Sequence, residues 1–273
     1  MIKSIINKGL KRVGYKVVKL STPVTEFYKE STPTQISKNF SYEDAMQFIF
    51  GLHVTTEGHI RTASIPKESL EYTSTYFKDL PKDRPLIALH IGNFVGISLT
   101  WMADQLRKIH PNSVVVSIDP NIIHRGVKYP LEVVIKLTNY FSLEENIIVL
   151  IGYSLEKNIS DGANTEHDGS MFRNGSIYPS FENTLQNLEL FSEQKYDLAL
   201  IDGNHESTYL SREIDHIYHL LKKNGLLILD DISDYWENRA QLKSIYDNAD
   251  EKRFIKVGTD GRVGILRKRN NEA

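Results

Sequence analysis

Short apolar runs recur along the second part of the chain, and each is rich in Ile, Leu and Val. Both faces of each run are apolar, which is typical of strands buried in a parallel sheet. Segments with apolar residues at helical spacing separate the runs, so the pattern predicts repeated strand–helix–strand units and a doubly wound α/β sheet. The predicted strands are residues 86–91, 113–119, 146–152, 196–202 and 225–231.

Crossover helices are predicted between these strands. The clearest is Ser211–Lys223, because Ile214, Ile217 and Leu221 fall on one face and Gly225 follows its basic last turn. The other predicted crossover helices are residues 99–110, 130–141 and 181–193.

The two ends of the chain differ from this repeating part. After the last strand, Asp260-Gly261 predicts a tight turn between residues 253–258 and 261–268, and hence an antiparallel hairpin. Before the first strand, two helices are predicted around a Gly- and Thr-rich connection, at residues 40–52 and 69–80. The expected organisation is a helical N-terminal segment over residues 1–80 and a Rossmann-like domain over residues 81–273.

Residues 158–180 match neither pattern. The segment is polar, Gly-rich and longer than most loops inside compact domains, and such loops are often lids or binding loops. A binding loop and a disordered loop are both open interpretations of this segment.

Composition narrows the class of protein. The chain has 273 residues, of which 40% are hydrophobic and 25% charged, which is ordinary for a globular protein and not for a disordered one. Its net charge of -2 gives no reason to expect nucleic-acid binding. The absence of Cys excludes disulfides, thiolate metal sites and a Cys nucleophile, and it fits a cytoplasmic protein.

The sequence contains neither an apolar stretch of the roughly 18 residues that span a membrane nor a secretory signal. Residues 1–20 carry six Lys and Arg and no acid, with apolar residues at helical spacing. Such a basic amphipathic helix could lie weakly on the inner membrane surface, or it could pack on the domain.

Ligands bind beyond the carboxyl ends of the strands in a sheet of this type. Gly92 and Gly96 follow the first strand, where a tight turn would let the backbone approach a ligand. Asp119 ends the second strand and could accept both ribose hydroxyls of a nucleoside. Tyr153 and Ser154 follow the third strand, where an adenine ring could lie.

Carboxylates at two neighbouring strand ends give the sharpest chemical signal. Asp202 follows the fourth strand and Asp230-Asp231 follow the fifth. Without compensation these charges would repel, and a divalent cation such as Mg²⁺ would neutralise them. His205 lies three residues after Asp202, within reach of a hydroxyl proton, and is the candidate general base.

Residues 86–268 resemble class I S-adenosylmethionine-dependent methyltransferases, on the motifs "IDG-x-H" after the fourth strand and "LDD" after the fifth. The similarity is greatest to the metal-dependent O-methyltransferases of macrolide sugars, and the catechol O-methyltransferases share the arrangement. The resemblance implies that Asp202, Asp230 and Asp231 hold Mg²⁺ and that His205 is the base. The implied cofactor contacts are His90, Gly92, Asn93, Gly96, Ser98, Asp119, Tyr153, Ser154 and Asp202.

Two of these positions depart from the family pattern. The family usually has an acid where this chain has His90, and often Asp where it has Tyr153. Both departures concern cofactor contacts and leave the metal ligands intact.

The expected function is Mg²⁺-dependent O-methylation of a sugar hydroxyl, in a glycan or a glycosylated natural product. Asp168, Arg173 and Tyr178 in the long loop are suited to contact a sugar. Homo-oligomerisation is a further open expectation. The alternatives are a phenol or catechol O-methyltransferase, a catalytically silent scaffold, and a metal-dependent hydroxylase, which would typically need two His and one carboxylate.

Overall fold

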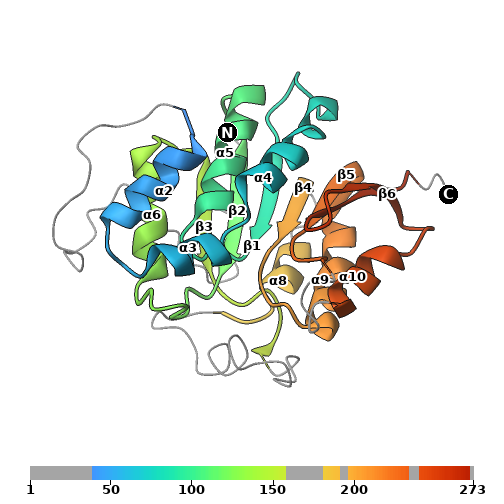
Figure 1. Ribbon diagram of the computed structural model, residues 1–273. Helices are drawn as coiled ribbons and strands as arrows, with labels where there is room; N and C mark the ends of the chain where they lie inside the picture. The colour runs from blue at the N-terminus through green and yellow to red at the C-terminus, as the bar shows by residue number, and fades with distance from the viewer. Residues whose placement is uncertain (1–38, 158–180, 191–195, 234–239, 271–273) are drawn as a thin grey trace.

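A seven-stranded sheet forms the centre of the protein in a computed structural model that describes residues 39–157, 181–190, 196–233 and 240–270. The strand order is β3-β2-β1-β4-β5-β7-β6, with β1 to β5 parallel and β7 antiparallel to both neighbours (Figure 1). The expected Rossmann-like sheet with a C-terminal hairpin is therefore confirmed. The strands are β1 (Ile87–Ile91), β2 (Val114–Asp119), β3 (Ile147–Ile151), β4 (Tyr196–Ile201), β5 (Leu221–Leu229), β6 (Phe254–Thr259) and β7 (Gly264–Lys268).

Apolar side chains of both sheet faces are buried, so the parallel strands have a core on each side. One core joins Ala88, Val115 and Leu198 to the helices of the N-terminal half. The other joins Leu89 and Val116 to the later helices. Helices α2 (Tyr42–Gly51), α4 (Lys67–Ser74), α5 (Ile97–Ile109) and α6 (Pro130–Tyr140) contribute to the first core, and α8 (Thr184–Glu189), α9 (Ser207–Leu220) and α10 (Ala240–Asp247) to the second.

The sequence pattern missed two helices and misplaced the end of another. The connection predicted to be irregular contains α3 (Glu57–Ala63), whose first turn is capped by the Thr56 hydroxyl accepting from the backbone N–H of His59 at 3.2 Å. Helix α10 was not predicted either. Helix α9 ends at Leu220, and the residues expected to close it begin β5 instead. The predicted helix over residues 69–80 is α4 followed by the short 3-10 helix η1 (Phe77–Asp79).

The helical residues before β1 share the core of the sheet. Phe48 and Ile49 of α2 are buried in the same cluster as Val134 and Leu137 of α6. In Figure 1, α2 and α6 lie on the same side of the sheet, and α3 lies near the strand ends. The segment thus packs as part of the sheet's own core.

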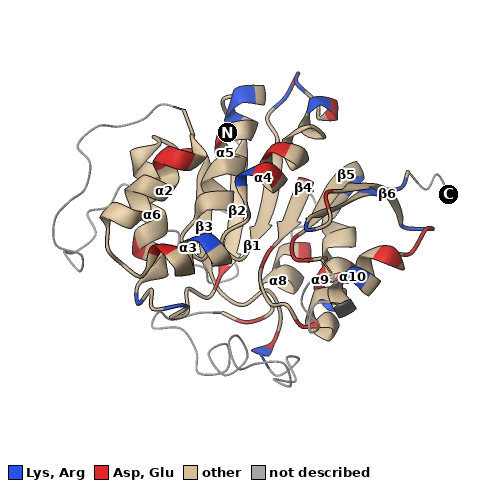
Figure 2. Cartoon of the chain, viewed as in Figure 1, with Lys and Arg blue, Asp and Glu red and all other residues tan. Residues whose placement is uncertain are grey.

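Lys, Arg, Asp and Glu are intermixed along the outer helices in the view of Figure 2. Within the described ranges, none of the helices has the length and apolarity to cross a bilayer. The basic segment 1–20 and the long loop 158–180 lie outside the described residues, so the membrane-surface and sugar-contact interpretations stay predictions.

Candidate active site

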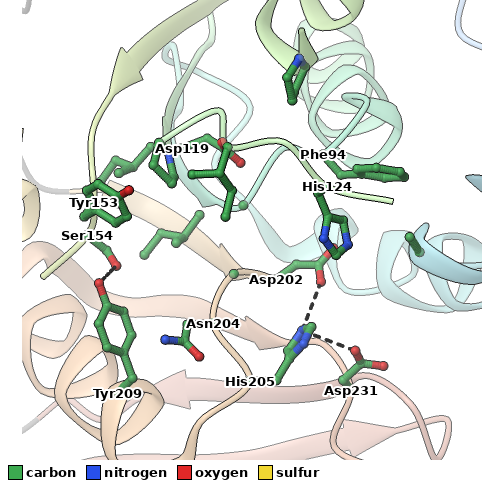
Figure 3. Close-up of a pocket in the computed structure, with 18 of the residues that line it drawn as sticks. Phe94, Asp119, His124, Tyr153, Ser154, Asp202, Asn204, His205, Tyr209 and Asp231 are labelled. Carbon is green, nitrogen blue, oxygen red and sulfur yellow. Dashed lines mark hydrogen bonds and ion pairs between the residues drawn. The ribbon is translucent and has the colours of Figure 1, made fainter. Parts of the chain in front are cut away.

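A pocket opens at the carboxyl ends of β1 to β5, where the ligand site was expected. The residues that line it come from the ends of these strands, the first turns of α9, helix α3 and the segment after β2. Figure 3 shows its side chains in two groups, one around Tyr153 and Tyr209 and the other around Asp202 and His205. Of the predicted site residues, the pocket is lined by Gly92, Asp119, Tyr153, Ser154, Asp202, His205 and Asp231.

Gly92 brings the backbone after β1 against the backbone after β4. Its φ of +87° is left-handed, and a Cβ there would lie 1.8 Å from the carbonyl oxygen of Asp202. No side chain fits in that space, so only glycine allows the two strand ends to approach so closely. This contact holds the wall of the pocket next to Asp202.

Asp119 is fixed by backbone donors. Its Oδ2 accepts from the N–H of Asn93 and its Oδ1 from the N–H of Asn121, each at 2.5 Å. Burial raises the pKa of Asp119, and these backbone hydrogen bonds oppose the effect. The carboxylate is therefore held rigidly at the pocket wall.

Four predicted cofactor residues lie behind the pocket wall and not among its lining residues. His90 is fully buried, and its Nε2 lies 3.0 Å from the Ser98 hydroxyl. Asn93 accepts a hydrogen bond from the Ser117 hydroxyl. Gly96 caps α5 with a φ of +87°. These residues shape the turn after β1, and their side chains do not reach the cavity.

Asp202, His205 and Asp231 form a compact cluster at one end of the pocket. His205 Nε2 lies 3.7 Å from Asp202 Oδ1 and 3.2 Å from Asp231 Oδ2. Potential ligand atoms of all three residues lie within 4.8 Å of one another, close enough to share one metal ion. Burial raises the pKa of Asp202, and the hydrogen bond and charge of His205 oppose it.

Asp230 is separated from this cluster, contrary to the expectation of three converging metal ligands. Both of its oxygens accept hydrogen bonds from Arg262, from Nε at 2.9 Å and from the guanidinium NH₂ at 2.8 Å. Burial and the charges of Asp202 and Asp231 raise the pKa of Asp230, while Arg262 opposes them. Burial alone would lower the pKa of Arg262, but Asp230, together with the charges of Asp231 and Asp202, outweighs burial and raises the pKa. The structure thus pairs Asp230 with an arginine on the hairpin.

Asp231 reaches the cluster from an unusual backbone conformation. Its φ of +58° is left-handed, although it is not a glycine. Such a conformation costs on the order of 1 kcal/mol or more and is concentrated at functional sites. The turn after β5 thus gives two successive carboxyl groups different surroundings. Asp230 is held by Arg262, whereas Asp231 lies 3.2 Å from His205 and also forms an ion pair with Arg262 at 3.4 Å.

The other end of the pocket contains a buried polar group that the sequence analysis did not identify. The Ser154 hydroxyl donates to Glu213 and lies 3.2 Å from the Tyr209 hydroxyl, which also accepts from the N–H of Leu155 at 3.0 Å. Burial raises the pKa of Glu213 to about 8. Both Glu213 and Tyr209 lie on α9, where Glu213 interrupts an apolar stripe; this interruption was the available signal.

The sequence pattern gave no signal for the residues on the far side of the cluster. Phe94 and His124 pack ring to ring at 5.3 Å, and both line the pocket. Arg125 follows, and its guanidinium donates to Thr62 of α3 at 3.1 Å. Helix α3 therefore borders the same cavity, with Thr62 and Ala63 in its wall.

A family model described as a methyltransferase domain matches residues 89–232, which is more than half of the chain. A comparison with curated protein sequences found no match.

Solved structures share the fold. An O-methyltransferase from Bacillus cereus in complex with S-adenosylhomocysteine is similar with a TM-score of 0.51 and 12% identity, over 98% of each chain. A methyltransferase from Podospora anserina bound to S-adenosylhomocysteine is similar with a TM-score of 0.53 and 9% identity, over 98% of this chain and 95% of that one. The fold of the present chain is that of S-adenosylmethionine-dependent O-methyltransferases, and the chain belongs to the methyltransferase-domain family.

Proposed function

We propose that this methyltransferase transfers the methyl group of S-adenosylmethionine to a hydroxyl oxygen, with a divalent cation, most simply Mg²⁺, held by Asp202 and Asp231. One observation carries the proposal: Asp202, His205 and Asp231 converge within 4.8 Å in the same pocket as Asp119. Oxygen ligands suit a hard divalent cation, and a bound cation would help the two neighbouring buried carboxylates stay ionised, in addition to Arg262, which pairs with Asp231.

His205 is the general base of the proposed reaction. Its Nε2 lies beside both Asp202 and Asp231, so it can take a proton from a hydroxyl placed next to either carboxylate. Methyl transfer from a sulfonium requires an aligned, deprotonated oxygen, which is mainly a matter of positioning. When bound, the cation would lower the pKa of the acceptor hydroxyl.

Asp119 and Gly92 support a nucleoside cofactor on the other side of the cluster. The backbone donors that fix Asp119 leave further lone pairs on its oxygens, and these can accept the ribose hydroxyls. The backbone at Gly92 is open to the pocket and can lie against the methionine part. Structures of the same fold that hold S-adenosylhomocysteine support this choice of cofactor.

A sugar hydroxyl is the proposed acceptor. Two adjacent oxygens of a sugar diol could bind the cation together, which would place one of them beside His205. The rim formed by Thr62, His124 and Arg125 offers hydrogen-bonding groups for further hydroxyls. A catechol presents the same pair of oxygens and is the alternative acceptor for the acceptor screen.

The first experiment is calorimetric titration with S-adenosylhomocysteine, with and without Mg²⁺, followed by turnover on sugar diols and catechols. We expect micromolar binding, turnover that requires the cation, and a preference for sugars. Asp231→Asn should abolish the Mg²⁺ dependence and most turnover. Asp215→Asn is the matched control, because Asp215 is an exposed carboxylate on α9 paired with Arg253.

Failure to bind S-adenosylhomocysteine in either condition would overturn the methyltransferase activity and leave the scaffold interpretation. Turnover that is indifferent to Mg²⁺ and to Asp231→Asn would overturn the metal assignment alone. The iron-type hydroxylase has less support, because the metal-binding group among the described residues contains a single histidine.

A further inference from the structure

Two buried polar groups line the part of the pocket near Tyr209 and Ser154. Glu213 is fully buried, and its Oε2 has no hydrogen-bond partner among the described residues. Asn204 is 8% exposed, and its Nδ2 likewise lacks a partner in the described part of the chain. Both residues line the pocket. Because an unsatisfied buried donor or acceptor is costly, the pair indicates a ligand that supplies the missing partners.

The orientations of both side chains are fixed by neighbours. The Oδ1 of Asn204 accepts from the backbone N–H of Glu206 at 3.1 Å, so the amide presents Nδ2, its donor, to the pocket. One oxygen of Glu213 accepts from the Ser154 hydroxyl, which leaves Oε2 as the open position. Figure 3 shows the Asn204 amide nitrogen on the side of Tyr209 and Ser154, away from Asp231.

The surrounding surface suits a flat heteroaromatic ring. Tyr153, Ile118 and Ile122 line this cavity together with Pro120. Asp119 stands at the end of β2, adjacent to the β3 end that carries Tyr153. A ribose at Asp119 would therefore place its base in the group around Tyr153, Asn204 and Glu213.

We propose that Glu213 and Asn204 recognise the Watson–Crick edge of the cofactor's adenine. The open oxygen of Glu213, which is the carbonyl oxygen when the carboxyl is protonated, accepts a hydrogen bond from the 6-amino group, and the Nδ2 of Asn204 donates one to N1. The inference rests on the proposed cofactor and adds the residues that select its base.

The test compares S-adenosylhomocysteine with S-inosylhomocysteine, in which a carbonyl replaces the 6-amino group and N1 carries a hydrogen. Binding of both ligands to the full chain is measured by calorimetry. The wild-type chain should bind the adenine compound at least about tenfold more tightly, because two hydrogen bonds become unfavourable contacts in the other.

The two variants separate the contributions. Glu213→Leu should weaken binding of S-adenosylhomocysteine by about 10- to 100-fold and reduce the preference for adenine. Asn204→Asp keeps the Oδ1 acceptor for Glu206 and replaces the donor by an acceptor, so it should shift the preference toward the inosine compound by at least about tenfold. Thermal unfolding of each free variant checks the fold.

Glu132→Leu is the matched control. Glu132 on α6 is also buried, and within the described ranges its Oε2 has no hydrogen-bond partner, but it does not line the pocket. Its removal should leave the ratio of the two affinities unchanged. A wild-type chain that binds both compounds equally, or folded variants that keep the wild-type ratio, would overturn the inference and leave the proposed function intact. Binding of neither compound by the wild-type chain would overturn both.

Discussion

His205 combines a position between two carboxylates with partial exposure, since 23% of its side chain is accessible. His205→Ala should lower turnover by about 10²–10⁴, the usual effect of removing a general base. The affinity for S-adenosylhomocysteine should stay nearly unchanged. Steady-state kinetics and calorimetry measure the two effects. His216→Ala is the control, because His216 lies on α9, does not line the pocket and pairs with Glu189 of α8 at 2.8 Å.

A loss of folding stability in His205→Ala, with normal turnover per folded molecule, would contradict the catalytic role. Full rescue of turnover by raising the pH would be consistent with it, because hydroxide then replaces the base.

His90 predicts a dependence of stability on pH. Burial lowers its pKa to about 3, whereas the unfolded chain has the ordinary value of 6.5. Below pH 6.5 the unfolded state therefore binds a proton that the folded state does not bind. The free energy of unfolding consequently decreases as the pH is lowered, by up to about 1.4 kcal/mol per pH unit. The free energy of unfolding, measured by urea denaturation between pH 7 and pH 4, should decrease less steeply with falling pH in His90→Gln, which retains a polar group for Ser98. Parallel curves for the two proteins would contradict the assignment.

Single residues also show where sequence reasoning stops. The cluster of Asp202, His205 and Asp231 was predicted because its members follow adjacent strand ends, a relation that the sequence pattern contains. The pairing of Asp230 with Arg262 depends on the antiparallel pairing of β7 with β5, which the spacing of residues along the chain does not reveal. Glu213 was missed because a charged residue on a predicted helix is usually exposed.

At the scale of elements, helix α3 connects the N-terminal part to the pocket. The Thr55 hydroxyl donates to the Arg125 carbonyl at 2.6 Å, and the Arg125 guanidinium donates to Thr62. These contacts fix Ala63 at the pocket wall, near the acceptor side. Helix α3 was not predicted because Gly58 and Thr62 weaken its helical propensity. The strands were predicted because burial on both faces makes them uniformly apolar.

Ala63→Phe should narrow the acceptor side of the pocket. We expect the KM for the acceptor to rise about tenfold or more, because a bulky ring occupies space that the acceptor needs. The affinity for S-adenosylhomocysteine should change less than about twofold. Glu57→Phe places the same ring at an exposed position of α3 and is the control. An unchanged KM in Ala63→Phe would show that α3 does not border the bound acceptor.

At the scale of the whole molecule, the sheet and the preceding helices share one core. The sequence predicts a division at residue 80, between a helical segment and the strand-containing domain. In the structure, however, Phe48 and Ile49 of the helical segment are buried in the same core as side chains of α6. A fragment of residues 81–273 should therefore lack a cooperative thermal transition, because it exposes this apolar surface. Calorimetry and circular dichroism test it, with residues 39–273 as the matched control. A cooperative transition of the shorter fragment near that of the full chain would contradict the shared core.

The left-handed backbone at Asp231 lowers the stability of the folded state, whereas the side chain at this position serves the proposed reaction. Glycine would relieve the conformation and remove a buried charge, so a selection for heat resistance alone would favour Asp231→Gly. A selection for turnover would retain the aspartate despite its cost. The residue at position 231 in related chains therefore indicates whether selection for stability or selection for turnover has prevailed. A glycine there would identify relatives that retain the fold but have lost the reaction.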